Sequence, residues 1–203
     1  MGNFNRLSRV QGIGVVVKLD AQLIDEALGG DSAAFGQLVT RYQDRLYNSL
    51  VHVVGSAEAA RDVTQDALVQ AYVKLETFER ASGFYTWLYR IAMNMAISHL
   101  RREKPTVSIE QARDALGHEP IDRGASPAAR LEQQERACQV RTALGTLSDE
   151  HRAILILREI DGCGYEQIAE ILDLPIGTIR SRLFRARLQL RDQLKSMIQE
   201  EMK

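Results

Sequence analysis

The sequence predicts an all-α protein made of two small helical domains joined by a flexible linker, the second of which contains a helix-turn-helix. Three observations predict this. Apolar residues recur at spacings of three and four in several segments, as in amphipathic helices. No strand-like alternation of useful length follows residue 19. Prolines and glycines gather between the two helical groups, where the apolar period fades.

These observations divide the 203 residues into four parts. We expect a disordered lead-in at residues 1–19 and a first helical domain at residues 20–102. A linker at residues 103–127 then leads to a second helical domain at residues 128–203. The lead-in shows no sustained period. The linker assignment rests on its loss of apolar period and its breaking residues.

The first domain is expected to contain three helices. An apolar stripe over residues 35–53 marks the first helix, and Asp31 precedes it as a capping residue. Gly55 interrupts the pattern, and two further stripes follow over residues 63–78 and 85–100. The domain is therefore a small helical bundle.

The second domain begins a new helical group. Pro127 suits the first position of a helix that ends near Leu147. Ser148 then opens another helix, with two acidic residues placed favourably for the helix dipole. The stripes of residues 165–172 and 176–190 flank a tight turn, which predicts a helix-turn-helix.

Composition excludes several classes of protein. The chain is 45% apolar and 26% charged, which is ordinary for a globular protein, and it contains no run of eighteen uncharged apolar residues. Cys138 and Cys163 are too few for a disulfide framework, so we expect a reducing, cytoplasmic location. We expect Cys138 to be a small core residue and Cys163 to be a surface thiol.

Charge is unevenly distributed along the chain, although the net charge is only −1. Residues 20–79 carry a net charge of −6, whereas residues 80–104 carry +4. Within the acidic part, Asp62, Gln65 and Asp66, with Gln70, lie opposite the apolar stripe of their helix. This polar ridge is either a solvated face or a docking surface.

The second helix of the helix-turn-helix predicts contact with DNA. Five arginines and no acidic residue occur in residues 176–191, whereas a merely solvated helix usually mixes both signs. Arginine pairs with guanine edges or phosphate, and hydroxyl groups near the helix start can bind phosphate oxygens. The candidate DNA-binding residues are Thr178, Arg180, Ser181, Arg182 and Arg185.

A second basic zone is aromatic as well. Residues 84–89 hold four of the twelve aromatic residues of the chain, and Arg90 and Asn94 follow them. Rings that stack on unpaired bases beside cations are typical of single-stranded nucleic acid binding. The alternative is a helical core, which we favour for Trp87. For the exposed side through Arg90 and Asn94, both interpretations remain open.

Three segments in this order resemble the sigma-70 superfamily of bacterial transcription initiation factors, and in particular its small, two-domain extracytoplasmic-function group, which is RpoE-like and is also called group 4. The resemblance covers roughly residues 20–203. It is carried by the sequences DVTQDA at residues 62–67, FYTWLYRIA at residues 84–92, and YEQIA with PIGTIRSRL at residues 165–169 and 175–183.

The resemblance implies an RNA polymerase sigma factor that binds core enzyme and directs promoter-specific initiation. Asp62, Gln65 and Asp66 would dock on the clamp helices of the polymerase beta-prime subunit. The second domain would recognise the minus-thirty-five element in duplex form and touch the beta flap. The first domain would recognise the minus-ten element and help to melt the promoter through Arg80, Ser82, Phe84, Tyr85, Arg90 and Asn94. An anti-sigma factor is the implied regulator.

Two other classes of protein fit the sequence less well than a sigma factor. An enzyme is disfavoured because the four histidines have no metal-ligand spacing and no phosphate-binding glycine loop occurs. We expect no catalytic residue, metal, cofactor or small-molecule substrate. The alternative function is a polymerase-independent helix-turn-helix regulator, which usually needs a dimer to contact two half-sites. The polar ridge and the aromatic helix argue against it.

Overall fold

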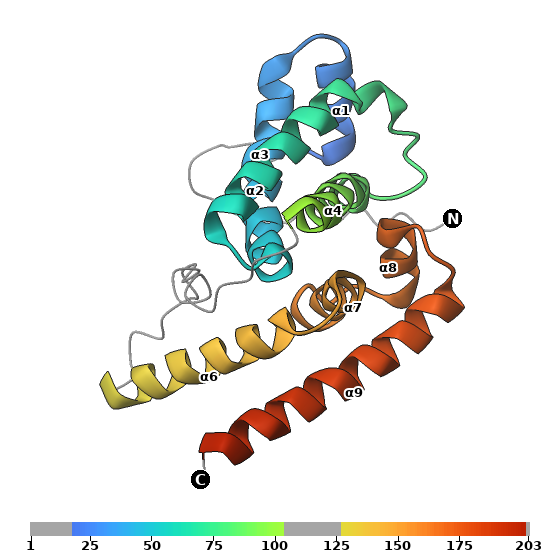
Figure 1. The fold of residues 1–203 in the computed structure, drawn as a ribbon. Coiled ribbons are helices and arrows are strands. Elements are labelled where there is room, and N and C mark those ends of the chain that lie inside the picture. The colour runs from blue at the N-terminus through green and yellow to red at the C-terminus, as the bar shows by residue number, and fades with distance from the viewer. Residues whose placement is uncertain (1–17, 104–126, 202–203) are drawn as a thin grey trace, which may run out of the picture.

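The computed structural model describes residues 18–103 and 127–201. Within these residues every regular element is a helix, which confirms the all-α prediction. The predictions for residues 1–17 and for most of the linker lie outside the described residues. Figure 1 shows α1 to α4 gathered in one module and α6 to α9 in a second one.

The first module contains four helices, which are α1 (Asp20–Leu28), α2 (Ser32–Val54), α3 (Ala57–Val73) and α4 (Phe84–Glu103). The predicted cap of α2 is confirmed, because Asp31 Oδ1 accepts a hydrogen bond from the backbone N–H of Ala33 at 2.9 Å. Gly55 ends α2 in the left-handed conformation, with φ of 81°. The helix predicted from the stripe over residues 63–78 is too long at its end. Helix α3 ends at Val73, and the short 3-10 turn η1 (Leu75–Thr77) follows it.

The second module contains α6 (Pro127–Gly145), α7 (Asp149–Leu155), the π turn η2 (Ile156–Ile160), α8 (Tyr165–Leu172) and α9 (Ile176–Glu201). The predicted proline start of α6 and the Ser148 cap of α7 are confirmed, since Ser148 Oγ accepts from the N–H of His151 at 3.3 Å. Helix α8, the turn and α9 form the predicted helix-turn-helix. Ile179, Leu183 and Ala186 of its second helix are buried.

The two modules pack against each other. Helix α4 packs on α2 and α3 on one side and on α8 on the other, so the buried apolar side chains form one cluster that runs through both modules. Arg152 of α7 joins the modules directly, because its guanidinium donates to the carbonyl of Val53 at 2.9 Å. Burial of the apolar side chains, at roughly 25 cal/mol per Å², drives this packing.

Candidate polymerase and promoter-binding surfaces

The predicted acidic ridge lies on the outer side of α3. Asp62, Gln65 and Asp66 are exposed, as is Gln70, while the opposite side of the helix is buried. Three large apolar side chains continue this surface toward the end of α3, and these are Val69, Tyr72 and Val73. Exposed apolar groups beside charges are typical of protein docking surfaces. The sequence analysis did not predict this apolar part, although Val69 and Val73 lie outside the apolar stripe of α3 and on the side of Asp62 and Asp66.

The loop before α4 holds two of the predicted minus-ten residues. Arg80 has a positive φ of 60° and its guanidinium pairs with the carboxylate of Asp25, which ties the loop to α1. Ser82 is half-buried. The side chains of this loop therefore lie at the surface, but Arg80 already has an acidic partner.

Phe84 is not at the surface. It is 4% exposed, and its ring packs 5.8 Å from the rings of both Phe78 and Trp87, measured between centroids. The predicted contact of Phe84 with DNA is therefore unavailable in this structure, because the ring fills the core under the loop. Trp87 is half-buried in the same aromatic cluster, in agreement with the prediction that it is a core residue.

Tyr85, Arg90 and Asn94 lie along α4 with different exposures. Arg90 and Asn94 are exposed, whereas Tyr85 is half-buried and Arg45 of α2 lies 4.2 Å above its ring. Burial raises the pKa of the Tyr85 hydroxyl, so the group stays neutral. Only part of the predicted aromatic surface is therefore open to a base.

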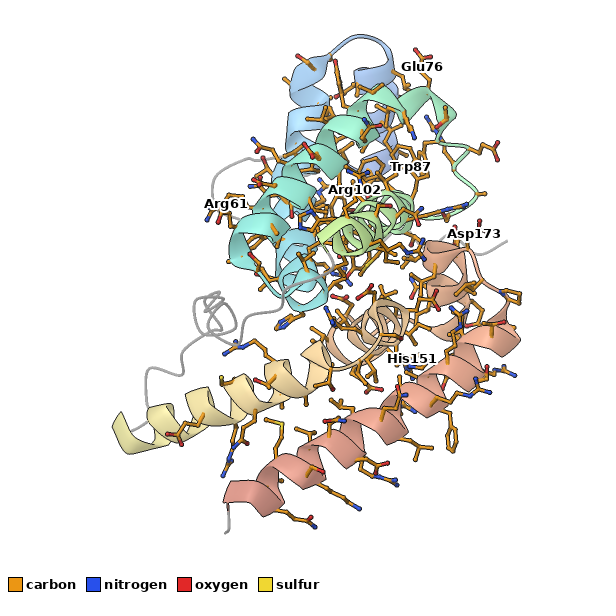
Figure 2. The ribbon with its side chains drawn as sticks, in the orientation of Figure 1. Arg61, Glu76, Trp87, Arg102, His151 and Asp173 are labelled. Carbon is orange, nitrogen blue, oxygen red and sulfur yellow. The ribbon has the colours of Figure 1, made fainter. Side chains whose placement is uncertain are left out.

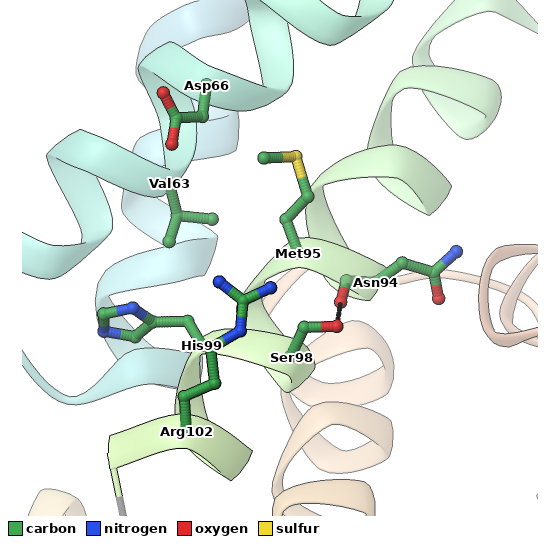
Figure 3. Close-up of a pocket in the computed structure, with 7 residues that line it drawn as sticks. All are labelled: Val63, Asp66, Asn94, Met95, Ser98, His99 and Arg102. Carbon is green, nitrogen blue, oxygen red and sulfur yellow. Dashed lines mark hydrogen bonds between the residues drawn. The ribbon is translucent and has the colours of Figure 1, made fainter.

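A polar pocket of about 250 Å³ lies between α3 and α4. Asp66 of the acidic ridge lines it from α3, while Asn94 and Arg102 line it from α4. Figure 3 shows the guanidinium of Arg102 turned toward the pocket and the amide of Asn94 turned away from it. One residue predicted to bind polymerase, Asp66, and one predicted to bind DNA, Asn94, thus line the same pocket.

The helix-turn-helix presents its arginines on α9. The turn is tight, because Asp173 adopts a left-handed φ of 54° and the N–H of Leu174 donates to the carbonyl of Ala169 at 3.0 Å. Of the five predicted residues, Arg180, Ser181 and Arg185 are exposed and Thr178 and Arg182 are half-buried.

Two features of α9 were not predicted. Phe184 is 64% exposed and lies between the predicted arginines in the sequence. Its apolar ring on a DNA-facing helix is suited to contact a thymine methyl group. Arg182 pairs with Glu150 of α7 at 2.7 Å, so one predicted DNA contact has an acidic partner inside the module. The exposed phenylalanine could have been found from its position outside the apolar stripe.

The exposures of the two cysteine side chains are the opposite of those predicted. Cys163 is buried and Cys138 is partly exposed, whereas the sequence suggested the opposite. Cys163 was misplaced because its flanking glycines resemble an exposed turn, but the chain there packs between the modules. Burial raises the pKa of the Cys163 thiol, which keeps it protonated and poorly reactive.

Metal-ligand clusters and membrane-spanning helices are both absent from the described parts of the chain. No group of three histidine, cysteine, aspartate or glutamate side chains is placed to hold a metal ion there. None of the described helices is long and apolar enough to cross a membrane.

An all-helical chain with a basic helix-turn-helix and a separate acidic, partly apolar surface is typical of a DNA-binding protein that works with a protein partner. Family models agree with this class. Sigma-70 region 2 matches residues 38–106, and sigma-70 region 4 matches residues 139–190.

Individual relatives give the same result. The RNA polymerase sigma-H factor of Pseudomonas aeruginosa is 38% identical over 186 residues, which are 89% of this chain and 96% of the relative. The extracytoplasmic-function sigma-E factor of Escherichia coli K12 is 36% identical over 188 residues, covering 88% of this chain and 96% of the relative. The chain belongs to the extracytoplasmic-function sigma factors of the sigma-70 family.

Solved structures show the same fold. The structure of CnrH in complex with the cytosolic domain of CnrY has a TM-score of 0.63 and 29% identity, and the alignment covers 87% of this chain and 97% of that one. The structure of the sigma factor RpoE with the anti-sigma factor NepR from Bartonella quintana has a TM-score of 0.60 and 27% identity, covering 79% and 96%. The chain is therefore an RNA polymerase sigma factor that recognises promoters through regions 2 and 4, and it is not an enzyme.

Proposed function

We propose that the acidic ridge of α3, formed by Asp62, Gln65 and Asp66, docks on the clamp helices of the beta-prime subunit of core polymerase. Two observations support this assignment. The three side chains are exposed together on one side of the helix. The apolar group at Val69 and Val73 continues the same surface and supplies area that gains free energy when it is covered.

We assign minus-ten recognition and melting to the first domain, residues 20–102. Its contacts are Arg80, Ser82, Tyr85, Arg90 and Asn94. The mixture of cations, a hydroxyl, an amide and one ring at the edge of α4 suits a flipped base beside a melted strand. Phe84 supports the loop from below and makes no contact with DNA in this assignment.

We assign recognition of the minus-thirty-five element to the second domain, residues 128–203, which would also touch the polymerase beta flap. The contacts of α9 with duplex DNA are Thr178, Arg180, Ser181, Arg182 and Arg185, together with the exposed ring of Phe184. The absence of acidic residues from residues 176–191 of α9 supports this role, because each arginine there that reaches a phosphate releases counterions.

We further propose that an anti-sigma factor regulates the chain in the cytoplasm. This proposal is supported by the solved structure of the related sigma factor RpoE, which is in complex with the anti-sigma factor NepR, and by that of CnrH, which is in complex with the cytosolic domain of CnrY. An anti-sigma factor would inhibit by covering the surfaces that the chain needs for polymerase and promoter.

The observation that carries the proposed function is the separation of an exposed acidic face on α3 from an exposed arginine face on α9. Asp66→Arg should weaken binding to core polymerase at least tenfold, because it reverses a charge within the ridge. Its matched control is Asp44→Arg, which reverses an exposed acid of α2 and leaves α3 unchanged. Equal binding by both variants would exclude the ridge as the docking surface.

For the DNA-binding face, Arg182→Ala should weaken promoter-directed transcription with core polymerase by about 1–3 kcal/mol if the side chain contacts a base. Arg191→Ala is the control, because this arginine lies further along α9 and pairs with the adjacent Asp192 at 2.8 Å. Transcription by Arg182→Ala at the level of the parent would remove this residue from the promoter contacts.

A further inference from the structure

Arg182 differs from the other arginines of the predicted DNA-binding face of α9. Its side chain is 29% exposed, and its Nη1 lies 2.7 Å from Oε2 of Glu150 in the first turn of α7. Arg180 and Arg185 of the same helix are exposed. Arg182 lies three positions after the buried Ile179, so it stands at the edge of the buried stripe of α9. This position brings its guanidinium within reach of α7.

Several contacts fix the helix end that carries Glu150. Ser148 caps α7 by accepting a hydrogen bond from the backbone N–H of His151. The side chain of His151 also reaches α9, because its Nδ1 lies 2.8 Å from Oε1 of Gln189, and Figure 2 shows His151 on the side of α7 that faces α9. The first turn of α7 therefore contacts α9 at Arg182 and again about two turns later. Glu150 is thus carried by a firmly placed element.

The ion pair of Glu150 with Arg182 lies inside the second module. It joins α7 to α9, and these two helices pack on each other. The other carboxylate oxygen of Glu150, Oε1, is 3.9 Å from the guanidinium of Arg101 in α4. The pair with Arg182 therefore depends on the packing of α7 against α9 and not on the first module. Because exposed ion pairs contribute little to stability, the consequence of this pair lies in how it holds the guanidinium.

A carboxylate partner changes what an arginine does on DNA. A guanidinium has more N–H donors than a guanine edge accepts, so an arginine that pairs through Nη1 keeps donors for a base. Holding the planar group in one orientation reduces the rotamer freedom that is lost on binding. The negative charge of Glu150 also offsets the charge of Arg182, which weakens its attraction to phosphates at any sequence. The pair therefore favours reading of a base over binding of phosphate.

We propose that Glu150 is a specificity-determining residue for the upstream promoter element, which orients Arg182 toward a base edge and lowers its attraction to phosphate. This inference rests on the proposed function, because it uses the assignment of Arg182 to promoter DNA. Glu150 makes no contact with DNA in this arrangement and acts through Arg182, so it is a positioning residue. It lies on α7, outside the helix-turn-helix of α8 and α9. The sequence selectivity of the second module therefore depends on α7 as well.

Transcription in vitro with the full chain and core polymerase tests this role. The templates are a promoter that the parent selects from a randomised library and variants of it that each carry one substituted base in the upstream element. The base read by Arg182 is the one at which Arg182→Ala loses the preference of the parent. A bidentate contact of this kind discriminates against a wrong base by roughly fivefold to more than a hundredfold.

Glu150→Ala should lower the preference at this same base about fivefold or more, because the released guanidinium adopts other orientations. Transcription from the templates with a wrong base should stay the same or rise, since the unpaired arginine still binds phosphate. The preference at the other bases should not change. A merely structural role of Glu150 would instead lower transcription from every template alike, so the two roles give different results.

Two further variants make this test decisive. Glu159→Ala is the matched control, because Glu159 also pairs with an arginine of α9, Arg187, whose Nε donates to Oε1 of Glu159 at 2.9 Å. Arg187 is not among the predicted DNA contacts, and both substitutions remove a negative charge from the second module. Only Glu150→Ala should therefore lose the preference at the base read by Arg182. In an Arg182→Ala chain, Glu150→Ala should have no further effect on this preference, because the residue through which it acts is gone.

Failure of the positioning role can be told apart from failure of the proposed function. The role of Glu150 is overturned by an unchanged preference in Glu150→Ala, by a uniform loss from all templates, or by an equal loss of preference in Glu159→Ala. A further loss when Glu150→Ala is added to Arg182→Ala would overturn it as well. In each of these cases, loss of preference in Arg182→Ala alone would still uphold the proposed contact of Arg182 with promoter DNA. If Arg182→Ala keeps the preference of the parent at every base, the proposed contact itself fails.

Discussion

Arg152 offers the sharpest test of how the fold is held together. It is 9% exposed, and its guanidinium donates to the carbonyls of Leu144, Gly145 and Leu147 in its own module and of Val53 in the other. These acceptors lie at or just beyond the ends of α6 and α2, where carbonyls have no partner within the helix. One arginine therefore caps a helix in each module, and Arg152→Ala should destabilise both the second module and its contact with the first.

The magnitude follows from the two shortest bonds, which are 2.9 Å to Val53 and 3.0 Å to Leu144. Hydrogen bonds to a charged donor are worth about 1.5–3 kcal/mol each, so losing these two costs about 3–6 kcal/mol. Burial lowers the pKa of Arg152, which means that the charged side chain carries a desolvation penalty that its removal relieves. We therefore expect Arg152→Ala to lower the free energy of unfolding by about 2–4 kcal/mol.

Urea unfolding followed by circular dichroism measures this change. With an m-value of about 2 kcal/mol/M, the midpoint should fall by about 1–2 M. Arg185→Ala is the control, because this arginine is exposed and a surface substitution changes stability by about 0.5 kcal/mol or less. A loss below about 1 kcal/mol for Arg152→Ala would refute the double-cap argument.

Two more predictions concern a helix end and a buried carboxylate. Gly55→Ala should lower the free energy of unfolding by about 1 kcal/mol, because φ of Gly55 is 81° and no neighbouring atom otherwise opposes a Cβ. Gly36→Ala inside α2 should instead raise it by about 0.5–1 kcal/mol, and urea unfolding of both variants checks the opposite signs. Because burial raises the pKa of Asp161, the folded chain takes up a proton, so the free energy of unfolding should fall as the pH rises from the ordinary carboxyl pKa through the raised one. Urea unfolding at a series of pH values should show this fall in the parent and a much weaker one in Asp161→Asn, and an equal response in both would contradict it.

The longest helices could be predicted from the sequence because each carries its own signal. The stripe of α2 begins at a side-chain cap and ends at a left-handed glycine, and both are local features that need no tertiary information. The helix-turn-helix was predictable for the same reason, since α8 and α9 each show an apolar period around a short turn. In contrast, α1 was missed because it has only nine residues and buries only Leu23, Ile24 and Ala27.

The packing of the two modules on each other could not be predicted from local pattern. Asp161 stands directly before the run Gly162 to Gly164, which resembles an exposed turn, and its hydrogen-bond partners are far away in the sequence. The π turn η2 begins inside a run of five consecutive apolar residues, 153–157, which carries no period to distinguish it from an α-helix. Phe84 was assigned to DNA because it neighbours tyrosines and arginines in the sequence, whereas its ring is buried against Tyr42 of α2 and Phe78, which are distant in the sequence or across the loop.

Transcription in vitro, with purified core polymerase and a randomised promoter library, tests the central claim most directly. A sigma factor with two separate DNA-binding regions should enrich promoters that share two conserved elements at a fixed spacing, and only when both the chain and core polymerase are present. Arg182→Ala should weaken selection at the upstream element, and Asp66→Arg should lose transcripts from all promoters. Enrichment of duplex sites by the chain alone, with no transcripts from core polymerase, would contradict the account.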